Sequence, residues 1–463
     1  MQAQLPRIGV LVLMLPDYEE LFPGITQRQA AFARSLLQPL GGVIDFRFTA
    51  PALGRQAIQA QVTQMKREGC DGILVLPLTY SQGQYLVKPC LDARLPLALA
   101  LVQPEETATA AFEEIDLTVN QAIHGAQDQA NCLKRAGIPY AAYAGHKGAP
   151  FNSFVEDFSA AAQTVARLRR MRIGVIGKLP GMGDVVTDDM AFFRKIGPEF
   201  VYDSIGAVWN HTQQVKAAQV HAVLERDRAV FDLDGRLEAR QLQTAAQMYL
   251  GLKHWLEAEG YDGFTIQFSE FGADGRFAQL PLLAASHLLA DGYGYAAEGD
   301  ASCAALVAGM SCLCGPANFT EMYMMDLARD ALLFCHAGEG NWQVARKDKK
   351  PRLIDRPLSE GGLSNPPTVV FTPQPGEATV MSIVHRGGES FALLTARGQV
   401  LADDPLARCE MPYMFFRPDC GARECAEKWL KEGGTHHEAV VFGDCSRRIS
   451  LLCQLLGIEH VSI

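Results

Sequence analysis

Two glutamates stand where a carboxylate could take part in chemistry. Glu270 follows the apolar segment Gly263–Phe268, a predicted strand, and open α/β sheets bind ligands beyond the carboxyl ends of their strands. Glu321 lies within Asn318–Asp326, where apolar neighbours make a buried charge costly unless a cation accompanies it. Each also has an ordinary interpretation, as a solvated or capping residue for Glu270 and as a helix-start acid for Glu321. The local sequence leaves both interpretations open.

One histidine has the surroundings of a metal ligand. His336 follows the apolar run Ala331–Cys335, a predicted strand, and is therefore expected at a strand end. Glu339 stands three residues beyond, where a carboxylate could orient the ring. The alternative is a lone histidine at the polar edge of a loop.

A pair of histidines precedes another predicted strand. His436 and His437 come after Gly433–Gly434, a turn signal, and before the strand segment Glu438–Phe442. Because adjacent strand residues point to opposite faces, only one of the two rings can face a given site. His436 lies closer to the turn, so His437 is the favoured ligand, and the choice between the two stays open.

Together these side chains form a mixed oxygen and nitrogen shell. Two carboxylates with one or two imidazoles, and no thiolate, suit Mn²⁺ or another divalent cation such as Co²⁺ or Mg²⁺. A divalent ion that chelates a carbonyl and its neighbouring hydroxyl acidifies the C–H between them, and a carboxylate can move that proton across the ene-diol. The predicted chemistry is aldose–ketose isomerisation of a sugar.

A glycine-rich segment offers a different activity. Gly174–Asp184 follows a predicted strand, but it has neither the spacing of a dinucleotide site nor the Gly-Lys-Ser/Thr ending of a phosphate loop. Pro180 also removes an amide donor from this loop. A dehydrogenase is therefore disfavoured, and the segment is interpreted as a structural turn.

Composition narrows the class of protein. Lys and Arg number 42 against 52 Asp and Glu, a net charge of -10, and no basic block marks a nucleic-acid-binding arm. No apolar run approaches the roughly 20 residues of a membrane-spanning helix, and the N-terminus lacks a secretory signal pattern. The 12 cysteines are scattered, as reduced thiols are. We expect a soluble, cytoplasmic protein that binds neither nucleic acid nor membranes.

The order and spacing of the predicted strands and helices indicate two successive Rossmann-like α/β domains followed by a C-terminal β-barrel-like domain. These elements position the residues discussed above. The first domain is expected at 1–168, the second at 169–326 and the third at 327–463. Near Met171 the sequence Arg-Ile-Gly-Val repeats the first strand, which marks the start of the second α/β series. Strands are predicted at 8–15, 43–49, 72–79, 95–102, 140–145, 197–203, 263–268, 331–335, 368–371, 378–385, 391–395 and 438–442, and helices at 25–37, 56–66, 117–135, 152–170, 221–224, 240–259 and 280–291.

The order of several motifs resembles the L-arabinose isomerase branch of the arabinose/fucose isomerase family. The resemblance spans roughly residues 110 to 445, with the motifs in the same order as in that family. The matching segments are Asn120–Gly125, Phe264–Glu270, Gln279-Leu-Pro, Ala290–Asp300, Phe319–Met322, His336–Glu339 and Gly433–His437.

The resemblance implies a function and a set of roles. It implies an intramolecular oxidoreductase that interconverts an aldose and a ketose, with Glu270, Glu321, His336 and His437 as metal ligands. Glu270 and Glu321 would also be the catalytic acid/base groups. His124 and Gln279 would contact the sugar. It also implies homo-oligomers, often hexamers, in which His124 reaches a neighbouring subunit's site.

Two departures from the family bear on the substrate. Family members carry a sugar-contacting Gln-His-Leu-Tyr element after the first strand, where this chain has Leu13–Gly24. Gly340-Asn-Trp replaces the Cys-Pro that usually follows His-x-x-Glu. The sugar, whether a pentose, a hexose or a modified sugar, therefore stays open. So does a non-catalytic sugar-binding or regulatory protein, because two successive α/β domains also describe sugar receptors.

Overall fold

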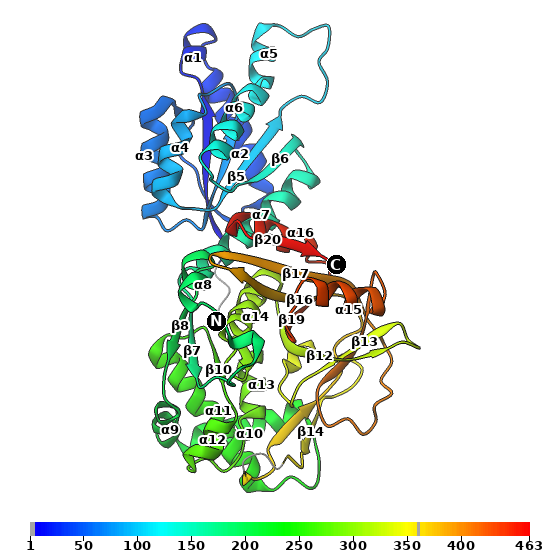
Figure 1. Cartoon of the computed structure of the whole chain (residues 1–463). Coiled ribbons are helices and arrows are strands. Elements are labelled where there is room, and N and C mark those ends of the chain that lie inside the picture. The colour runs from blue at the N-terminus through cyan, green and yellow to red at the C-terminus, as the bar shows by residue number, and fades with distance from the viewer. Residues whose placement is uncertain (1–4, 359–361) are drawn as a thin grey trace. The chain divides into compact units, whose positions relative to one another are not determined.

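The computed structural model describes residues 5–358 and 362–463, which fall into two units (Figure 1). The smaller unit holds the described residues up to Arg167 together with Arg447–Ile458. The larger unit holds Leu168–Ser446 together with Glu459–Ile463. The three domain ranges expected from the sequence stay predictions.

The smaller unit is built on a parallel sheet with the strand order β2-β1-β4-β5-β6, and β3 pairs with β1. Successive strand residues point to opposite faces, so helices cover both sides. On one face, Leu11 and Val75 pack with Ile58 of α3 and Leu133 of α6. On the other, Gly72 lies against α7. The elements are β1 (Arg7–Met14), β2 (Asp45–Arg47), β3 (Ala52–Leu53), β4 (Gly72–Pro77), β5 (Leu97–Gln103), β6 (Ala141–His146), α1 (Asp17–Leu21), α2 (Ile25–Leu37), α3 (Gly54–Arg67), α4 (Gln84–Ala93), α5 (Glu114–Asn120), α6 (Ala122–Arg135), α7 (Ala149–Leu168) and α16 (Ser446–Leu456).

The larger unit begins with a second parallel sheet, ordered β11-β10-β7-β8. Its helix α14 is apolar on all sides and packs between β10 and β11 on one side and β19 on the other. This helix therefore joins the sheet to the barrel described below. The elements are β7 (Arg172–Ile176), β8 (Glu199–Tyr202), β9 (Asp232–Leu233), β10 (Gly263–Ile266), β11 (Gly294–Ala297), α8 (Asp189–Lys195), α9 (Ile205–Gln213), α10 (Ala217–Val230), α11 (Ala239–Glu259), α12 (Ser269–Asp274), α13 (Leu282–Ala290) and α14 (Ala301–Cys314).

A closed antiparallel barrel follows, with the strand order β16-β19-β12-β13-β18-β17, and β16 pairs with β17 to close it. The inward side chains of alternating residues, among them Phe334, Leu394 and Val440, form its core. The α/β class with a C-terminal barrel is thus confirmed. The barrel strands are β12 (Asn318–Asp326), β13 (Ala331–Cys335), β16 (Gly376–Gly387), β17 (Ser390–Val400), β18 (Tyr413–Pro418) and β19 (His437–Phe442), and α15 (Ala422–Lys431) packs against them. A separate small sheet contains β14 (Arg352–Asp355), β15 (Pro367–Val370) and β9, and β20 (Glu459–Ser462) pairs with β17 outside the closed ring.

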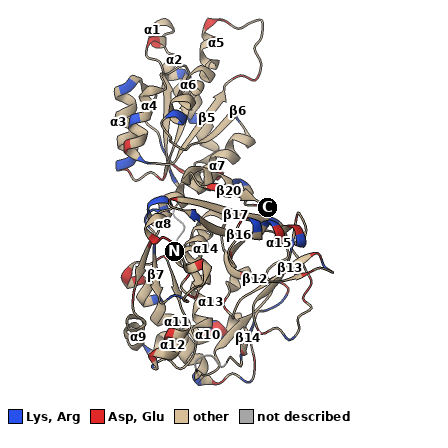
Figure 2. Ribbon diagram, in the orientation of Figure 1, with Lys and Arg blue, Asp and Glu red and all other residues tan. Residues whose placement is uncertain are grey.

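Some elements differ from those the sequence predicts. The expected helix 117–135 is two helices, because the chain leaves helical geometry at Gln121. Asn120 and His124 therefore lie on different helices. Glu321 lies within a strand and not at a helix start. No helix in the described ranges is long and apolar enough to cross a membrane. Charged residues of both signs are scattered over each unit (Figure 2).

Candidate metal centre

Strand pairing in the barrel brings three predicted site residues together. Glu321 on β12 lies directly opposite His437 on β19 and opposite Cys335 on β13. His336 is the residue after Cys335. Because paired residues of neighbouring strands share a face, the register places the Glu321 carboxylate beside the His437 ring. His336 lies just beyond the end of β13, so its approach to the same carboxylate does not follow from the register.

A second carboxylate comes from the parallel sheet. Glu298 follows β11 and adopts a left-handed backbone conformation with φ 63°. Gly299 comes next with φ 92°, and a Cβ there would lie 2.5 Å from the Cα of Lys178. Asp300 then caps α14 by accepting a hydrogen bond from Cys303 N over 2.9 Å. The tight turn thus fixes both acidic residues at the carboxyl end of β11.

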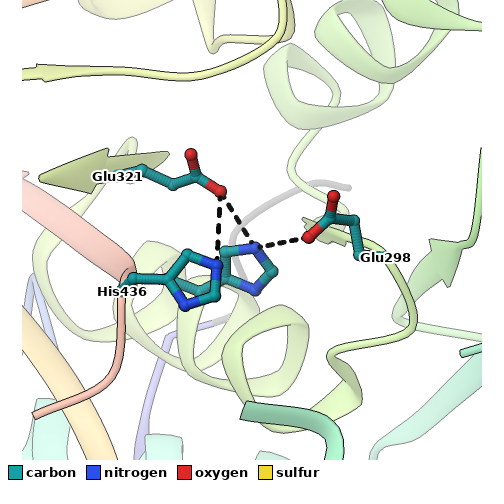
Figure 3. Close-up of side chains that lie close together, drawn as sticks. Glu298, Glu321 and His436 are labelled. Atoms are coloured by element: carbon teal, nitrogen blue, oxygen red, sulfur yellow. Dashed lines mark ion pairs between the residues drawn. The ribbon is translucent and has the colours of Figure 1, made fainter. Parts of the chain in front are cut away.

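The side chains of Glu298, Glu321 and His436 lie close together (Figure 3), and the two carboxylates face the Nε2 atom of His437. This nitrogen lies 3.1 Å from Glu321 Oε1 and 3.5 Å from Glu298 Oε2. His336 Nε2 lies 3.4 Å from the same Glu321 oxygen. The His437 ring is fully buried, yet its Nε2 makes no hydrogen bond within the described chain. Such a nitrogen, facing two carboxylate oxygens, has the donor chemistry of a metal ligand.

The opposite nitrogens of the two rings are held by other carboxylates. His336 Nδ1 lies 2.8 Å from Glu339 Oε2, and the Tyr295 hydroxyl donates to Glu339 Oε1 over 2.6 Å. His437 Nδ1 lies 3.1 Å from Asp300 Oδ2. Because carboxylates accept, each Nδ1 is placed to donate a proton, and each Nε2 would offer its lone pair to a metal ion bound at the centre.

The charge balance of the centre favours a cation. Burial alone lowers the pKa of His437, but Asp300, Glu298 and Glu321 outweigh it and raise the pKa to about 12. The same contact with His437 lowers the pKa of Glu298 against the effect of its burial. The surrounding carboxylates therefore stabilise positive charge strongly at this point.

His436 lies at the edge of the centre. Its side chain is half exposed, and its Nδ1 is 2.8 Å from Asp184 Oδ2. Asp184 also accepts a hydrogen bond from the His437 amide over 3.1 Å. His436 Nε2 is 3.9 Å from Glu321 Oε1, farther than His437. His437 is thus the more central ring, and Asp184 ties the pair to the segment after β7.

Glu270 lies near the same sheet edge but outside this convergence. It is in the first turn of α12, after β10, and its carboxylate lies against Gly177, which follows β7. Among the described residues, two groups of possible ligand atoms converge, one formed by Glu298, Glu321, His436 and His437 and one by Asp184, Asp300 and His437. Neither group contains Glu270, and His336 joins the first only through its contact with Glu321. The role of Glu270 as a ligand stays a prediction.

The two predicted sugar-contacting residues lie elsewhere. Gln279 is buried, its amide lies 3.4 Å from the carbonyl oxygen of Gln241, and it forms a bridge with Ser364. His124 is exposed on α6 of the smaller unit. Their contacts with a sugar stay predictions.

Sequence reasoning missed Glu298, Asp300 and Asp184 as parts of the site. Glu298 and Asp300 carry a usable signal, since an acidic pair flanking a glycine follows the apolar segment Gly294–Ala297 and precedes an apolar helix. Asp184 carries none, because its contact with His437 depends on the fold.

Comparison with known proteins agrees with this architecture. Residues 183–315 match the L-arabinose isomerase central domain, and residues 316–459 match the L-arabinose isomerase C-terminal domain. The L-arabinose isomerase of Acidothermus cellulolyticus is 26% identical over 428 residues, which cover 89% of this chain and 84% of that protein. That of Clostridium beijerinckii is 25% identical, covering 86% of this chain and 81% of that protein.

The comparison with solved structures is much weaker. A periplasmic solute-binding protein from Actinobacillus succinogenes with bound D-allose is 14% identical over 66% of this chain and 91% of that chain, with a TM-score of 0.17. That score is too low to establish a shared fold. The two domain matches decide the class: the chain belongs to the L-arabinose isomerase family and is a sugar isomerase, an intramolecular oxidoreductase that interconverts an aldose and a ketose.

Proposed function

We propose that the chain is a divalent-metal-dependent ketol isomerase whose metal ligands are Glu298, Glu321, His336 and His437. The observation that carries this proposal is the buried Nε2 of His437, which faces two carboxylate oxygens and makes no hydrogen bond within the described chain. The oxygen and nitrogen donors suit Mn²⁺, Co²⁺ or Mg²⁺. Glu298 takes the place that the sequence had suggested for Glu270.

The residues of the centre would divide the work of proton transfer. A bound divalent cation supplies polarisation of the sugar carbonyl and its neighbouring hydroxyl. Glu321 would accept the proton from the carbon that bears the hydroxyl and return it to the neighbouring carbon. Asp300 and Glu339 keep both imidazoles in one tautomer. Glu270, at the same edge of the sheet, remains a second candidate for the proton carrier.

L-arabinose is the first substrate to test, because the relatives are named for it. We infer a small sugar as the substrate class, either a pentose, a hexose or a modified sugar. A homo-oligomer in which His124 completes a neighbouring site, and a cytoplasmic location, also remain predictions.

Calorimetry with Mn²⁺ tests the ligand set. We expect binding in the unmodified chain and a loss of at least tenfold in affinity in Glu298→Gln and Glu321→Gln, because each removes a charged oxygen donor. Glu270→Gln is the matched comparison, with the same charge change at the same sheet edge, and should retain affinity. Loss in Glu270→Gln with retention in Glu298→Gln would reverse our assignment.

Solvent-deuterium incorporation tests the chemistry. The metal-loaded chain is incubated in heavy water with a panel of aldoses that begins with L-arabinose, and deuterium at C1 of the ketose and at C2 of the recovered aldose is measured by NMR. An isomerase incorporates deuterium and forms a ketose, whereas Glu321→Gln should do neither. A chain that binds sugars but leaves hydrogen at C2 in place would be a binding protein, against our proposal.

A further inference from the structure

The larger unit contains a second cavity whose charge is opposite to that of the metal centre. The segment Arg346–Arg352 reads Arg-Lys-Asp-Lys-Lys-Pro-Arg, although the whole chain has a net charge of -10. It lines a cavity of about 390 Å³ together with residues that follow β15 and precede β18. This cavity shares no lining residue with the metal centre. A molecule bound in this cavity would therefore be distinct from one bound at the metal centre.

The cations of this cavity differ in how far they are neutralised. Arg346 pairs with Asp348 at 2.6 Å, and Lys349 pairs with Asp404 at 2.5 Å. Lys350 and Arg352 have no carboxylate within ion-pair distance in the described ranges. Their polar contacts are backbone carbonyls, Arg228 O for Lys350 and Cys409 O for Arg352, each at 3.4 Å. Two positive charges are thus available to an anion.

A buried hydroxyl supplies an independent sign of a ligand. Thr372 lines the same cavity and is 8% exposed, yet its Oγ1 has no hydrogen-bond partner within the described chain. Its position is fixed, because Thr372 O accepts a hydrogen bond from Arg346 N over 3.0 Å. A buried hydroxyl that forms no hydrogen bond is costly. Because the oxygen itself is buried, it reaches a ligand oxygen in the cavity after the Thr372 side chain rotates about its Cα–Cβ bond.

The remaining walls are apolar. Pro351, Val370, Phe371 and Leu406 line the cavity beside the cations. An inorganic anion alone would leave these surfaces in contact with water. A molecule with an anionic end and a compact, partly apolar body would contact both the cations and the apolar walls of the cavity.

We propose that this cavity binds a small phosphate monoester, with Lys350 and Arg352 holding the phosphate and Thr372 donating a hydrogen bond to it. Two unpaired cations match a dianion, and the planar guanidinium of Arg352 can donate two hydrogen bonds to phosphate oxygens. The ester-linked group lies against Phe371 and Leu406. Free inorganic phosphate would make the same contacts with the two cations but not with the apolar walls. The test below therefore compares inorganic phosphate with a monoester.

Calorimetry on the full-length, metal-loaded chain in phosphate-free chloride buffer tests the proposal. The probes are phenyl phosphate, inorganic phosphate and acetate. We expect the affinity order phenyl phosphate, then phosphate, then acetate. In the Lys350→Gln, Arg352→Gln double variant, the affinity for phenyl phosphate should fall at least tenfold. The Lys428→Gln, Lys431→Gln double variant on α15 removes the same charge elsewhere and should bind as the unmodified chain does.

A third variant separates a specific contact from general attraction. Thr372→Val keeps the shape of the side chain and removes a hydroxyl that has no partner in the chain. Affinity for phenyl phosphate should fall severalfold while the melting temperature stays the same or rises, which a purely structural role would not produce.

Several outcomes would overturn the proposal. Unchanged phenyl phosphate binding in the Lys350→Gln, Arg352→Gln variant would exclude the cavity. Loss of binding in Glu321→Gln would place the anion at the metal centre. Equal affinity for phenyl phosphate and inorganic phosphate would reject the monoester in favour of free phosphate, and equal affinity for acetate would reject phosphate chemistry altogether.

Discussion

The Nδ1 atom of His437 lies 3.1 Å from Asp300 Oδ2, and this contact joins the two halves of the candidate metal centre. Asp300 is the N-cap of α14, which packs on the parallel sheet, whereas His437 begins a barrel strand. The sheet thereby sets the orientation of an imidazole that the barrel supplies. The centre depends on both substructures of the larger unit at once.

Replacing Asp300 by Asn should weaken metal binding without unfolding the helix end. Asn retains a cap oxygen for Cys303 N but no longer attracts the His437 proton, so the ring orientation is less well fixed. Mn²⁺ affinity, measured by calorimetry, should fall about 10- to 100-fold. In Asp300→Ala the cap is lost as well, and the free energy of unfolding should drop by a further ~1 kcal/mol. Equal Mn²⁺ affinity in the unmodified chain and Asp300→Asn would show that this contact does not position His437.

Gly299→Ala should disturb the acidic turn more than a surface substitution does. The backbone at Gly299 has φ 92°, and a Cβ would approach the Cα of Lys178 to 2.5 Å, so both strain and a clash with backbone follow. We expect a loss of stability on the order of 1–3 kcal/mol together with weaker Mn²⁺ binding. Gly292→Ala is the matched control, since it has the same φ of 92° with open space around it. Similar Mn²⁺ affinity in both variants would mean that the close approach at Gly299 does not shape the centre.

Part of the candidate site could be predicted from the types of its residues and their order along the chain. Glu321, His336 and His437 stand at strand ends or in strands, and their chemistry is recognisable in the sequence alone. The choice between Glu270 and Glu298 could not be made this way. The two residues follow neighbouring parallel strands, β10 and β11, and both reach the same sheet edge. Which one approaches His437 depends on how α14 sets the sheet against the barrel.

The fold, too, has elements that the sequence predicts and others that it does not. Strands with continuous apolar runs, such as Gly72–Pro77, were predictable because burial on both faces leaves a clear pattern. The break at Gln121 was not, since polar residues on both sides give the same helical periodicity. There the structure shows that Asn120 accepts a hydrogen bond from the Glu105 amide and Asp128 one from the Gly83 amide. Asn120 and Asp128 thus bind the backbone of neighbouring loops, and the periodicity of polar residues along a helix gives no sign of such contacts.

A buried histidine outside the candidate metal centre should make stability depend on pH. Burial lowers the pKa of His287, although Asp227, 3.2 Å from its Nε2, opposes this shift. Trp342 donates to the Nδ1 of the same ring over 3.3 Å. In the unfolded chain the pKa returns to about 6.5, so the unfolded state binds more protons below that pH. Stability is therefore fully present above pH ~6.5 and declines as the pH falls toward the lower folded pKa.

Thermal unfolding between about pH 7.5 and 5.5 measures this dependence. The melting temperature of the unmodified chain should fall more steeply with decreasing pH than that of His287→Gln, which lacks the titrating ring at this position. His124→Gln is the control, because His124 is exposed and its loss should leave the slope unchanged. Parallel curves for the unmodified chain and His287→Gln would show that this ring does not contribute.

Removal of divalent metal should lower the stability of the larger unit. The ligands come from the turn after β11 and from β12, β19 and the residue after β13, so an ion bound to all of them stabilises the native arrangement over the unfolded chain. At a free metal concentration 100 times the dissociation constant, this linkage contributes about 2.7 kcal/mol. We therefore expect the melting temperature to rise by several degrees when Mn²⁺ is added to chelator-treated protein, and Glu298→Gln and His437→Asn to lose most of that rise.

His436→Asn should keep more of this rise than His437→Asn, because His436 is half exposed and lies farther from Glu321. If His436→Asn abolished the rise and His437→Asn preserved it, the ligand would be the outer histidine, and the inner ring would serve only to pack the barrel against α14.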